Sequence, residues 1–318
     1  MDENQSKQYD TIKGRDELRS LRLRYGIGLF VTIVLLGISI PIFLISKKYG
    51  IIPLGIGLLS CFLWVRIMKQ YTAVVKDLTG QTLNKIDYLS EVSYDPNGSF
   101  NLDDLQSLGM LKKGIDYKMG DLVSAKCNDI PFKMCDLKIE EQKKSSNGST
   151  INSTFFRGKF IVFHVKRKFD ASALIYTNQF KGIGNGLPET MSGTVQPAPA
   201  AGNGNTETDD GTPKPFINIT EEILGKTGKF QVLTSNGQSN SNIFTDSLFS
   251  NLMTVSQKLK VPFALMFKED KIFIAINDNK DMFEITLANK PDAAPEEQRI
   301  KQEMDIVPFL AENIADHY

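Results

Sequence analysis

The feature that most constrains this chain is a long apolar run without charge close to its N-terminus. Residues 26–45 contain no Asp, Glu, Lys, Arg or His, and a second apolar run at residues 49–68 contains only Arg66. A helix of about 20 apolar residues spans a hydrocarbon core of about 30 Å. The sequence therefore predicts a transmembrane hairpin over residues 26–68, with spans at 26–45 and 49–68 and a polar link around residues 46–50.

The two apolar runs have two other possible interpretations, a secretory signal peptide and a buried hairpin. A secretory signal peptide has an apolar core of about 7–15 residues and a small-residue cleavage site. The first run is longer than that, and the second run follows it at once. A buried hairpin in a water-soluble protein is the other alternative, but uncharged runs of this length are rare there. The membrane hairpin is the favoured reading.

The orientation of the hairpin follows from the basic residues beside it. Lys and Arg next to membrane spans favour the cytoplasmic side. They lie mainly outside the hairpin, before the first span and after the second, and fewer lie in the link: Lys13, Arg15, Arg19, Arg22 and Arg24; Arg66, Lys69 and Lys76; Lys47 and Lys48. We expect a multi-pass protein of the cell inner (cytoplasmic) membrane, with residues 1–25 as a basic cytoplasmic tail and both termini cytoplasmic.

Neither span carries an ionisable residue in its centre. Ion pathways and proton relays in membranes usually depend on such residues. The sequence therefore favours an anchor as the role of the hairpin. The alternative hypothesis is an oligomeric pore or channel component built from several copies of the chain.

The rest of the chain predicts an α+β domain with a mixed set of helices and an antiparallel sheet, in two parts, residues 69–181 and residues 216–318. Residues 182–215 are rich in Gly, Pro, Ala, Asn and Thr and cannot bury enough apolar surface to order themselves, so they predict a flexible insertion. Apolar periodicity predicts helices at 69–92, 101–110, 241–260 and 295–318, the last interrupted at Pro308, and strands at 121–126, 131–140, 155–169, 173–176, 263–267, 271–276 and 283–287.

Composition excludes several classes of function. Basic and acidic residues balance at 37 each, so no nucleic acid is expected as a partner. The three cysteines lack zinc-ligand spacing, and we expect no metal and no cofactor. Gly225-Lys226-Thr227 lacks the earlier glycine of a phosphate-binding loop. His164 has no nucleophile or carboxylate assigned to it by the sequence, so no catalytic residue is predicted.

One compact basic cluster stands out in the soluble part. Lys166, Arg167 and Lys168 end the strand predicted at 155–169, with Arg157 and Lys159 nearby. A solvated strand end is the plain interpretation. The sharper hypothesis is contact with anionic lipid, which attracts each nearby basic residue by about 1 kcal/mol.

Four short patterns occur in a characteristic order. They are Tyr94-x-Pro96 with Ser107-Leu108-x-Met110; Tyr117-x-x-Gly120-Asp121-Leu122-Val123; Phe156-x-Gly158-x-Phe160 ending in Lys168-Phe169; and Phe230-x-Val232 through Leu265-x-Phe267 and residues 271–276 to Phe283. With them the chain resembles, over most of Tyr71 to Leu287, a bacterial family of two-helix membrane proteins with a cytoplasmic domain of unknown function, sometimes encoded near LemA-type proteins. Ala125, where a Gly is expected, and the insertion depart from the pattern.

The resemblance implies no activity, cofactor or catalytic residue. Together with an inert anchor, it favours a membrane-anchored interaction or scaffold protein. The expected partners are the lipid bilayer and a protein at the inner membrane face, with a LemA-type protein and a second copy of the chain as candidates. A membrane-bound enzyme of unrecognised chemistry remains the principal alternative.

Overall fold

The computed structural model describes residues 3–45, 47–145, 148–183, 216–224, 228–237, 241–245, 247–283 and 296–318. The chain divides into two compact units. One is Met1–Lys85 with Ile285–Lys301, and the other is Ile86–Glu284 with Gln302–Tyr318. Each unit is described by itself. The triplet at residues 225–227 and residues 184–215 of the predicted insertion lie outside the described residues.

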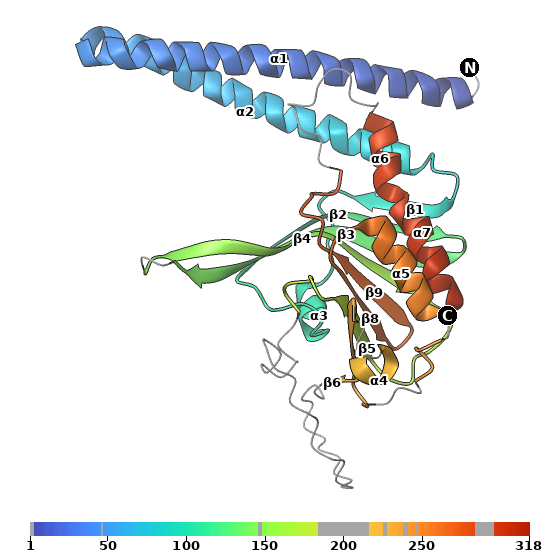
Figure 1. Cartoon of the computed structure of the whole chain (residues 1–318). Coiled ribbons are helices and arrows are strands. Elements are labelled where there is room, and N and C mark those ends of the chain that lie inside the picture. The colour runs from blue at the N-terminus through green and yellow to red at the C-terminus, as the bar shows by residue number, and fades with distance from the viewer. Residues whose placement is uncertain are drawn as a thin grey trace. The chain divides into compact units, whose positions relative to one another are not determined.

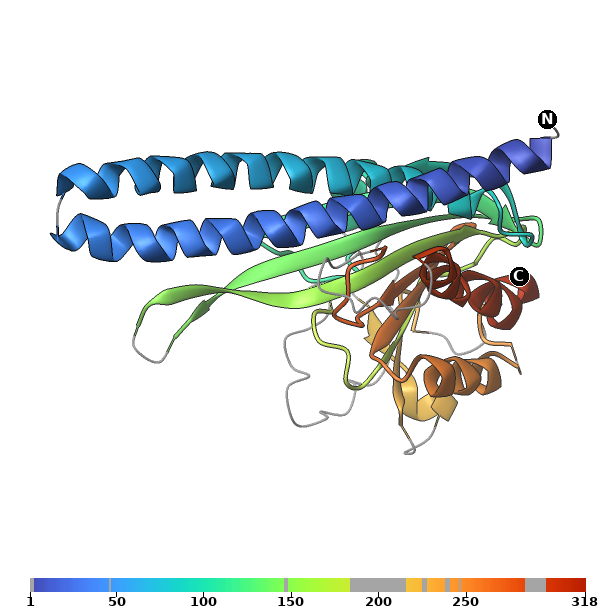
Figure 2. The same ribbon diagram turned by 90° about the horizontal axis from the view of Figure 1, so that it is seen from above.

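The first unit contains the predicted helical hairpin (Figures 1 and 2). Helices α1 (Glu3–Ile45) and α2 (Lys47–Leu83) lie side by side and antiparallel. The Tyr25 and Trp64 rings lie 5.5 Å apart, and the hydroxyl oxygens of Thr32 and Ser60 are 2.9 Å apart. Small polar side chains that bond across two helices are a common way to fix a membrane helix pair.

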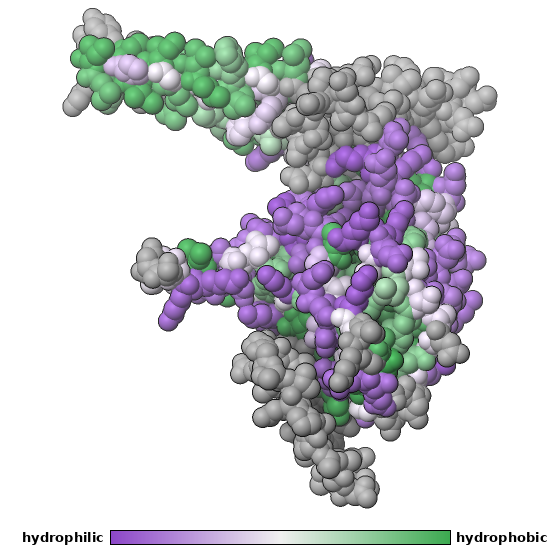
Figure 3. Space-filling view, in the orientation of Figure 1, coloured by the Kyte–Doolittle hydropathy of each residue, from purple (hydrophilic) through white to green (hydrophobic). Residues whose placement is uncertain are grey.

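Both helices contain a stretch long and apolar enough to cross a membrane, at Leu23–Ile45 and Leu58–Leu83. Large apolar side chains of this hairpin are exposed, and Figure 3 shows them as a continuous hydrophobic surface. Leu44 and Ile45 are 80% and 87% exposed. A hairpin in the core of a soluble protein would bury such side chains, so their exposure fits a lipid environment.

The limits of the hairpin helices differ from the prediction. The tail is not separate, because α1 already begins at Glu3 and runs on into the first apolar stretch. The link is shorter than expected, since Lys47 to Gly50 form the first turn of α2. The helix predicted to reach Val92 ends at Leu83, and Leu89 already belongs to a strand. Val92 and Tyr94 alternate with exposed neighbours, which is the pattern of an edge strand.

The second unit is built on a nine-stranded antiparallel sheet, which confirms the α+β prediction. Its strands follow the order β1-β2-β3-β4-β9-β8-β5-β7-β6 across the sheet. Strands from the two parts of the chain therefore interleave. The strands are β1 (Leu89–Asp95), β2 (Asp116–Cys127), β3 (Ile130–Lys144), β4 (Thr150–His164), β5 (Ala173–Thr177), β6 (Ile217–Asn218), β7 (Phe230–Thr234), β8 (Phe263–Lys268) and β9 (Lys271–Ile276).

Helices lie on both faces of this sheet (Figure 1). Helix α3 packs on one face, through a core cluster that contains Leu105, Phe160 and Phe273. Helices α5 and α7 lie on the other face, where the Tyr318 ring is 5.5 Å from that of Phe267. The helices are α3 (Leu102–Ser107), α4 (Thr220–Leu224), α5 (Leu248–Leu259), α6 (Glu296–Met304) and α7 (Ile306–Asn313), followed by the 3-10 turn η2 (Ala315–His317).

Strand β4 serves both faces through the alternation of its side chains. Phe160 and Val162 belong to the α3-side core, whereas Ile161 and Phe163 are fully buried on the opposite side. Strand β4 ends at His164, however, and not at Phe169. Beyond it the backbone bonds to the β8–β9 turn, with Val165 N–H donating to the Asp270 carbonyl at 2.9 Å.

Three further limits were predicted wrongly. Helix α5 begins at Leu248 because Ser241 and Asn242 instead donate hydrogen bonds to the Asp170 carboxylate. The C-terminal helix breaks at Asp305, and Pro308 lies within the first turn of α7, where a missing N–H costs little. Phe283 does not extend the sheet, since it lies in a turn with φ 57°.

The start of the predicted insertion is part of the fold. Lys112 N–H donates to the Gly182 carbonyl at 2.7 Å, and Leu111 forms an isolated bridge with Ile183. These contacts tie the segment after β5 to the loop before β2. Residues 182 and 183, the first two of the predicted insertion, are thus bonded to the loop before β2.

Gly158 allows the chain after β9 to approach β4 closely. It has φ 156°, and a Cβ atom there would lie 2.1 Å from the Ile276 carbonyl oxygen. We expect Gly158→Ala to destabilise the domain by about 1–3 kcal/mol, because the backbone of one strand must move. Thermal unfolding of the full chain in detergent, followed by circular dichroism, measures the loss.

Gly120→Ala is the matched control, since Gly120 also lies in a strand and a Cβ there would meet nothing closer than 3.6 Å. We expect its unfolding temperature to stay near that of the wild type. Equal unfolding temperatures for the two variants would contradict the steric role of Gly158.

Candidate functional site

A groove of about 410 Å³ opens on the α3 side of the sheet. Its wall on one side is α3 with the preceding Phe100 and Asn101, and its floor comes from β3, β4, β8 and β9. Asn101 fixes the start of α3, since its side chain accepts hydrogen bonds from the N–H groups of Asp103 and Asp104. Asn101 is therefore the N-cap of α3, at the start of the helix predicted for residues 101–110.

The floor of the groove is aromatic. The Phe100 ring lies edge-on to Phe160 with 5.4 Å between their centroids, and Phe160 lies 6.4 Å from Phe273. Val162 completes the floor. Phe160, Val162 and Phe273 are buried in the core beneath, so the floor is rigid and presents only a limited apolar area.

The rim of the groove carries three lysines, and the sheet register explains why they meet. Lys133 pairs with Val162 across β3 and β4, His164 with Lys271 across β4 and β9, and Lys268 with Lys271 across β8 and β9. Directly paired residues have their side chains on the same face. None of the three ammonium groups lies in an ion pair among the described residues.

Two carboxylates and one imidazole complete the rim. Asp104 and Glu269 line the groove beside the lysines. Burial lowers the pKa of His164, and the charges of Lys271 and Lys133 lower it further, while Asp270 opposes them. His164 is therefore neutral near pH 7 and able to donate or accept a hydrogen bond at the groove wall. No nucleophile contact was predicted for it.

The predicted basic cluster lies next to the groove and not in a strand. Lys166, Arg167 and Lys168 are exposed in the loop that follows β4, immediately after His164. Arg167 N–H donates to the Tyr318 carbonyl at 2.9 Å, and Asn242 donates to the Lys168 carbonyl at 3.0 Å. The backbone of this loop is thus held while its charged side chains face solvent.

The structure separates Arg157 and Lys159 from that cluster. They point to the opposite face of the sheet, where the Lys159 ammonium lies 2.8 Å from Asp278 and 2.8 Å from Glu303. Lys159 is only 5% exposed. Burial lowers its pKa, but the two carboxylates outweigh that effect and the net pKa is raised. Lys159 therefore stays charged and links β4, the segment after β9 and the end of α6.

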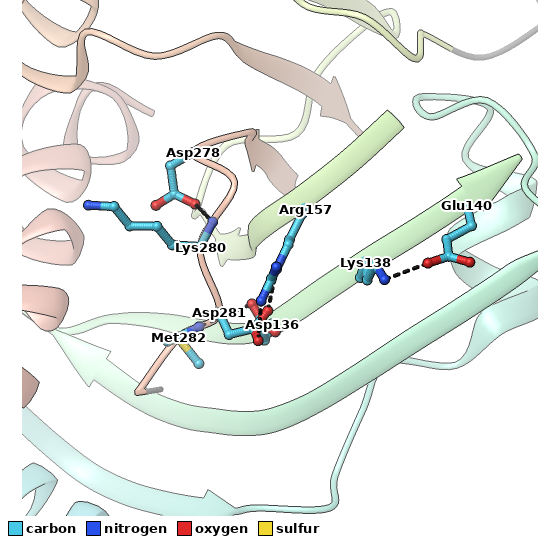
Figure 4. A network of polar contacts seen from close by, with 8 residues as sticks. All are labelled: Asp136, Lys138, Glu140, Arg157, Asp278, Lys280, Asp281 and Met282. Carbon is cyan, nitrogen blue, oxygen red and sulfur yellow. Dashed lines mark hydrogen bonds and ion pairs between the residues drawn. The ribbon is translucent and has the colours of Figure 1, made fainter. Parts of the chain in front are cut away.

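Arg157 and Asp136 hold the same segment at further points (Figure 4). Arg157 binds the Asp281 carboxylate with two nitrogens, one of them Nε at 2.6 Å. The Asp136 carboxylate accepts a hydrogen bond from Met282 N–H at 3.2 Å. Residues 277–283 are thus clamped to β4 by the ion pairs of Lys159 and Arg157, and to β3 by the hydrogen bond to Asp136.

Asp136 is an acid of this clamp whose carboxyl group has a raised pKa. Burial raises its pKa to about 7; the Met282 N–H lowers it, Asp281 and Asp121 raise it, and Lys159 lowers it. The neighbouring Asp121 accepts a 2.5 Å hydrogen bond from the Tyr94 hydroxyl. Asp136 faces the clamped segment and does not line the groove. Its protonation state therefore affects the stability of the fold and not the chemistry of the groove.

Metal and thiol chemistry find little support. Within the described part of the chain, no three His, Cys, Asp or Glu side chains are placed to hold a metal ion. Cys127 and Cys135 are buried and free, and burial raises the pKa of their thiols to about 11 and about 12. Both are therefore protonated and poorly reactive near neutral pH. They behave as small apolar core residues.

Sequence reasoning missed the groove lysines and the clamp. Lys268 and Lys271 are neighbours in the β8–β9 hairpin, but Lys133 lies far from them in the chain, and only the pairing of β3, β4 and β9 in the interleaved strand order brings it to them. A signal for the clamp did exist. Arg157 and Lys159 alternate on β4, and Asp278 and Asp281 follow the strand that pairs with it.

A family model described as "Protein of unknown function (DUF3137)" matches residues 154–315, just over half of the chain. By its architecture the protein is an α+β domain behind an apolar helical hairpin. It belongs to the DUF3137 family. The matched region begins in β4 and includes Lys159, Asp278 and Glu303 of the clamp. Comparison with curated proteins and with solved structures found no match.

Replacing Lys159 by Met should destabilise the domain by about 3–5 kcal/mol, because Asp278 and Glu303 would keep buried charges without a partner. Lys126→Met is the control; it breaks an exposed ion pair with Glu91, which contributes about 0–1 kcal/mol. Thermal unfolding of the full chain in detergent compares the two. A Lys159→Met chain that becomes no more stable when Asp278→Asn and Glu303→Gln are added would contradict the charge argument.

Asp136→Asn should make stability less dependent on pH. The folded pKa of Asp136 lies above that of an unfolded Asp, so the folded chain binds the extra proton between about pH 4 and pH 7 and loses stability as pH rises through that window. Asn keeps the acceptor for Met282 N–H and carries no charge. We expect the variant to gain about 1–2 kcal/mol over the wild type at about pH 8 and little at about pH 4.

The exposed Asp87→Asn variant serves as the control for general charge effects. Unfolding temperatures at the two pH values measure both variants against the wild type. A gain from Asp136→Asn that is the same at both values, or larger at the lower one, would show that Asp136 is ionised in the folded chain.

Proposed function

We propose that this chain is a membrane-anchored recognition protein, whose hairpin spans the bilayer and whose α+β domain binds a ligand or partner through the groove face. The observation that carries the proposal is the pairing of two features in one chain. The hairpin exposes large apolar side chains over both candidate spans. The folded domain presents a groove with an aromatic floor and three lysines that have no ion pair among the residues that the structure describes. The first feature favours anchoring, and the second favours binding.

The orientation with both termini on the cytoplasmic side of an inner membrane is part of this proposal. It is supported by the excess of Lys and Arg on the outer flanks of the hairpin over the link. This orientation places the domain at the inner leaflet. A protein partner recruited there, a LemA-type protein among the candidates, and self-association through the hairpin remain predictions.

The exposed loop of Lys166, Arg167 and Lys168 is proposed to contact that leaflet. Anionic lipid gives the inner surface a negative potential, and its attraction reaches about a Debye length, roughly 8–10 Å at physiological salt. The three side chains are exposed while the loop backbone is held by hydrogen bonds. Such a loop loses little further backbone entropy on contact.

Cysteine labelling on intact cells tests the orientation. In a Cys61→Ser background, Lys48→Cys in the hairpin link should react with a membrane-impermeant thiol reagent, whereas Lys118→Cys in the exposed part of β2 should react only after lysis. The native thiols of Cys127 and Cys135 are buried and should stay silent in the folded chain. Labelling of Lys118→Cys and protection of Lys48→Cys on whole cells would reverse the topology.

The anchor itself has a separate control. A hairpin that spans the bilayer should keep the full chain in the membrane pellet after alkaline carbonate washing. Release of the chain into the supernatant would show that the hairpin packs against protein, and it would contradict the proposal that the hairpin anchors the chain in the membrane.

A further inference from the structure

We infer that the groove is a headgroup site for a membrane lipid with one net negative charge. This inference rests on the proposed function, because the anchored domain would meet such lipids at the membrane surface. The ligand's phosphodiester would lie among Lys133, Lys268 and Lys271. The uncharged part of the lipid headgroup would lie between Phe100 in the wall and Phe273 in the aromatic floor.

The size and openness of the groove suit a headgroup. Small-molecule sites range from about 300 to 1,000 Å³, and the groove lies near the lower end at about 410 Å³. Its floor residues are already buried in the core, with Phe160 at 1% and Phe273 at 9% exposed. Little apolar surface is left for long acyl chains, which would stay in the bilayer.

The charges of the rim point to an anion. Lys268 and Lys271 face each other across the β8–β9 hairpin, an arrangement that is destabilising for like charges. Lys133 adds a third ammonium group from β3. An anionic oxygen between them would relieve the repulsion and supply the missing acceptor. Asp104 and Glu269 on the same rim repel polyanions, so a ligand with a single negative charge fits better than a nucleic acid.

The sheet position of the floor argues against an extended peptide as the occupant. Strand β4 pairs with β3 on one side and with β9 on the other at the groove, with Val162 opposite both Lys133 and Phe273. Their backbone groups are already used in the ladder, so a peptide cannot be added as a further strand. Only side-chain contacts remain, and those match a compact anionic headgroup.

Native mass spectrometry of the detergent-purified full chain tests the site. The probes are short-chain phosphatidylglycerol and, as the zwitterionic comparison, short-chain phosphatidylcholine. We expect one phosphatidylglycerol bound with preference over phosphatidylcholine. Lys133→Gln with Lys271→Gln should weaken binding by about tenfold or more, the equivalent of one lost hydrogen bond to a charged group.

Two further variants separate the groove from general surface charge. Ser107 lines the groove and is exposed, so Ser107→Trp should block the site without changing charge and weaken binding similarly. Lys118→Gln with Lys229→Gln removes the same charge from exposed positions outside the groove and should leave binding unchanged. The loop variant Lys166→Gln, Arg167→Gln, Lys168→Gln should keep the single bound lipid, because these side chains do not line the groove.

Several results would overturn the inference. Binding unaffected by both groove variants would place the lipid elsewhere, for instance around the hairpin. Equal affinity for the two lipids would reject recognition of the anion. An acidic peptide that binds more tightly than the lipid and is lost in both groove variants would assign the groove to a protein partner. Failure of the carbonate and labelling experiments would remove the anchored function, but it would leave the lipid result of the purified chain intact.

Discussion

The ion pairs of Lys159 hold together parts of the domain that are distant in sequence. Its ammonium group is buried on β4, and its two carboxylates come from the segment after β9 and from the end of α6. A charge in that position is tolerated only when both partners are present, since an unpaired buried charge costs several kcal/mol. The three segments therefore become ordered together. Gly158, the residue before Lys159, lets the backbone of Asp278 come close enough for this contact.

The same strand that carries the clamp also carries the groove floor. Because side chains alternate along a strand, Lys159 and Ile161 face α7 while Phe160 and Val162 face α3. The clamp on one face fixes the position of β9 against β4, and β9 then brings Lys271 and Phe273 to the groove on the other face. A variant that loosens the clamp would therefore disturb the groove without touching any of its lining residues.

Features that depend on local periodicity could be predicted from the sequence. The two apolar spans and the strands at residues 263–267 and 271–276 follow from patterns within about 20 residues. Element ends were less predictable, because they depend on tertiary bonds. Strand β4 ends at His164, because the next N–H group, that of Val165, donates to the Asp270 carbonyl. Helix α5 begins after the predicted residue 241, because the Ser241 hydroxyl donates to the Asp170 carboxylate. The candidate site could not be predicted, because Lys133 joins Lys268 and Lys271 of the β8–β9 hairpin only through strand pairings between distant segments. The basic cluster of Lys166, Arg167 and Lys168 could be recognised in the sequence because its residues are adjacent, and its role in lipid contact stays a prediction.

The strand order also constrains when the domain can fold. Strands β9 and β8 lie between β4 and β5, so β4 lacks one partner until the chain to Ile276 exists, and β5 lacks one until the chain to Lys268 exists. Long-range pairings of this kind form slowly, because the entropy of closing the chain is lost before contacts compensate for it. The apolar hairpin, by contrast, consists of two adjacent helices at the start of the chain. If it inserts as it emerges, the anchor is set before the sheet can close. Until β9 and β8 are made, β4 and β5 each have an unpaired edge, and unpaired strand edges are sites where chains aggregate.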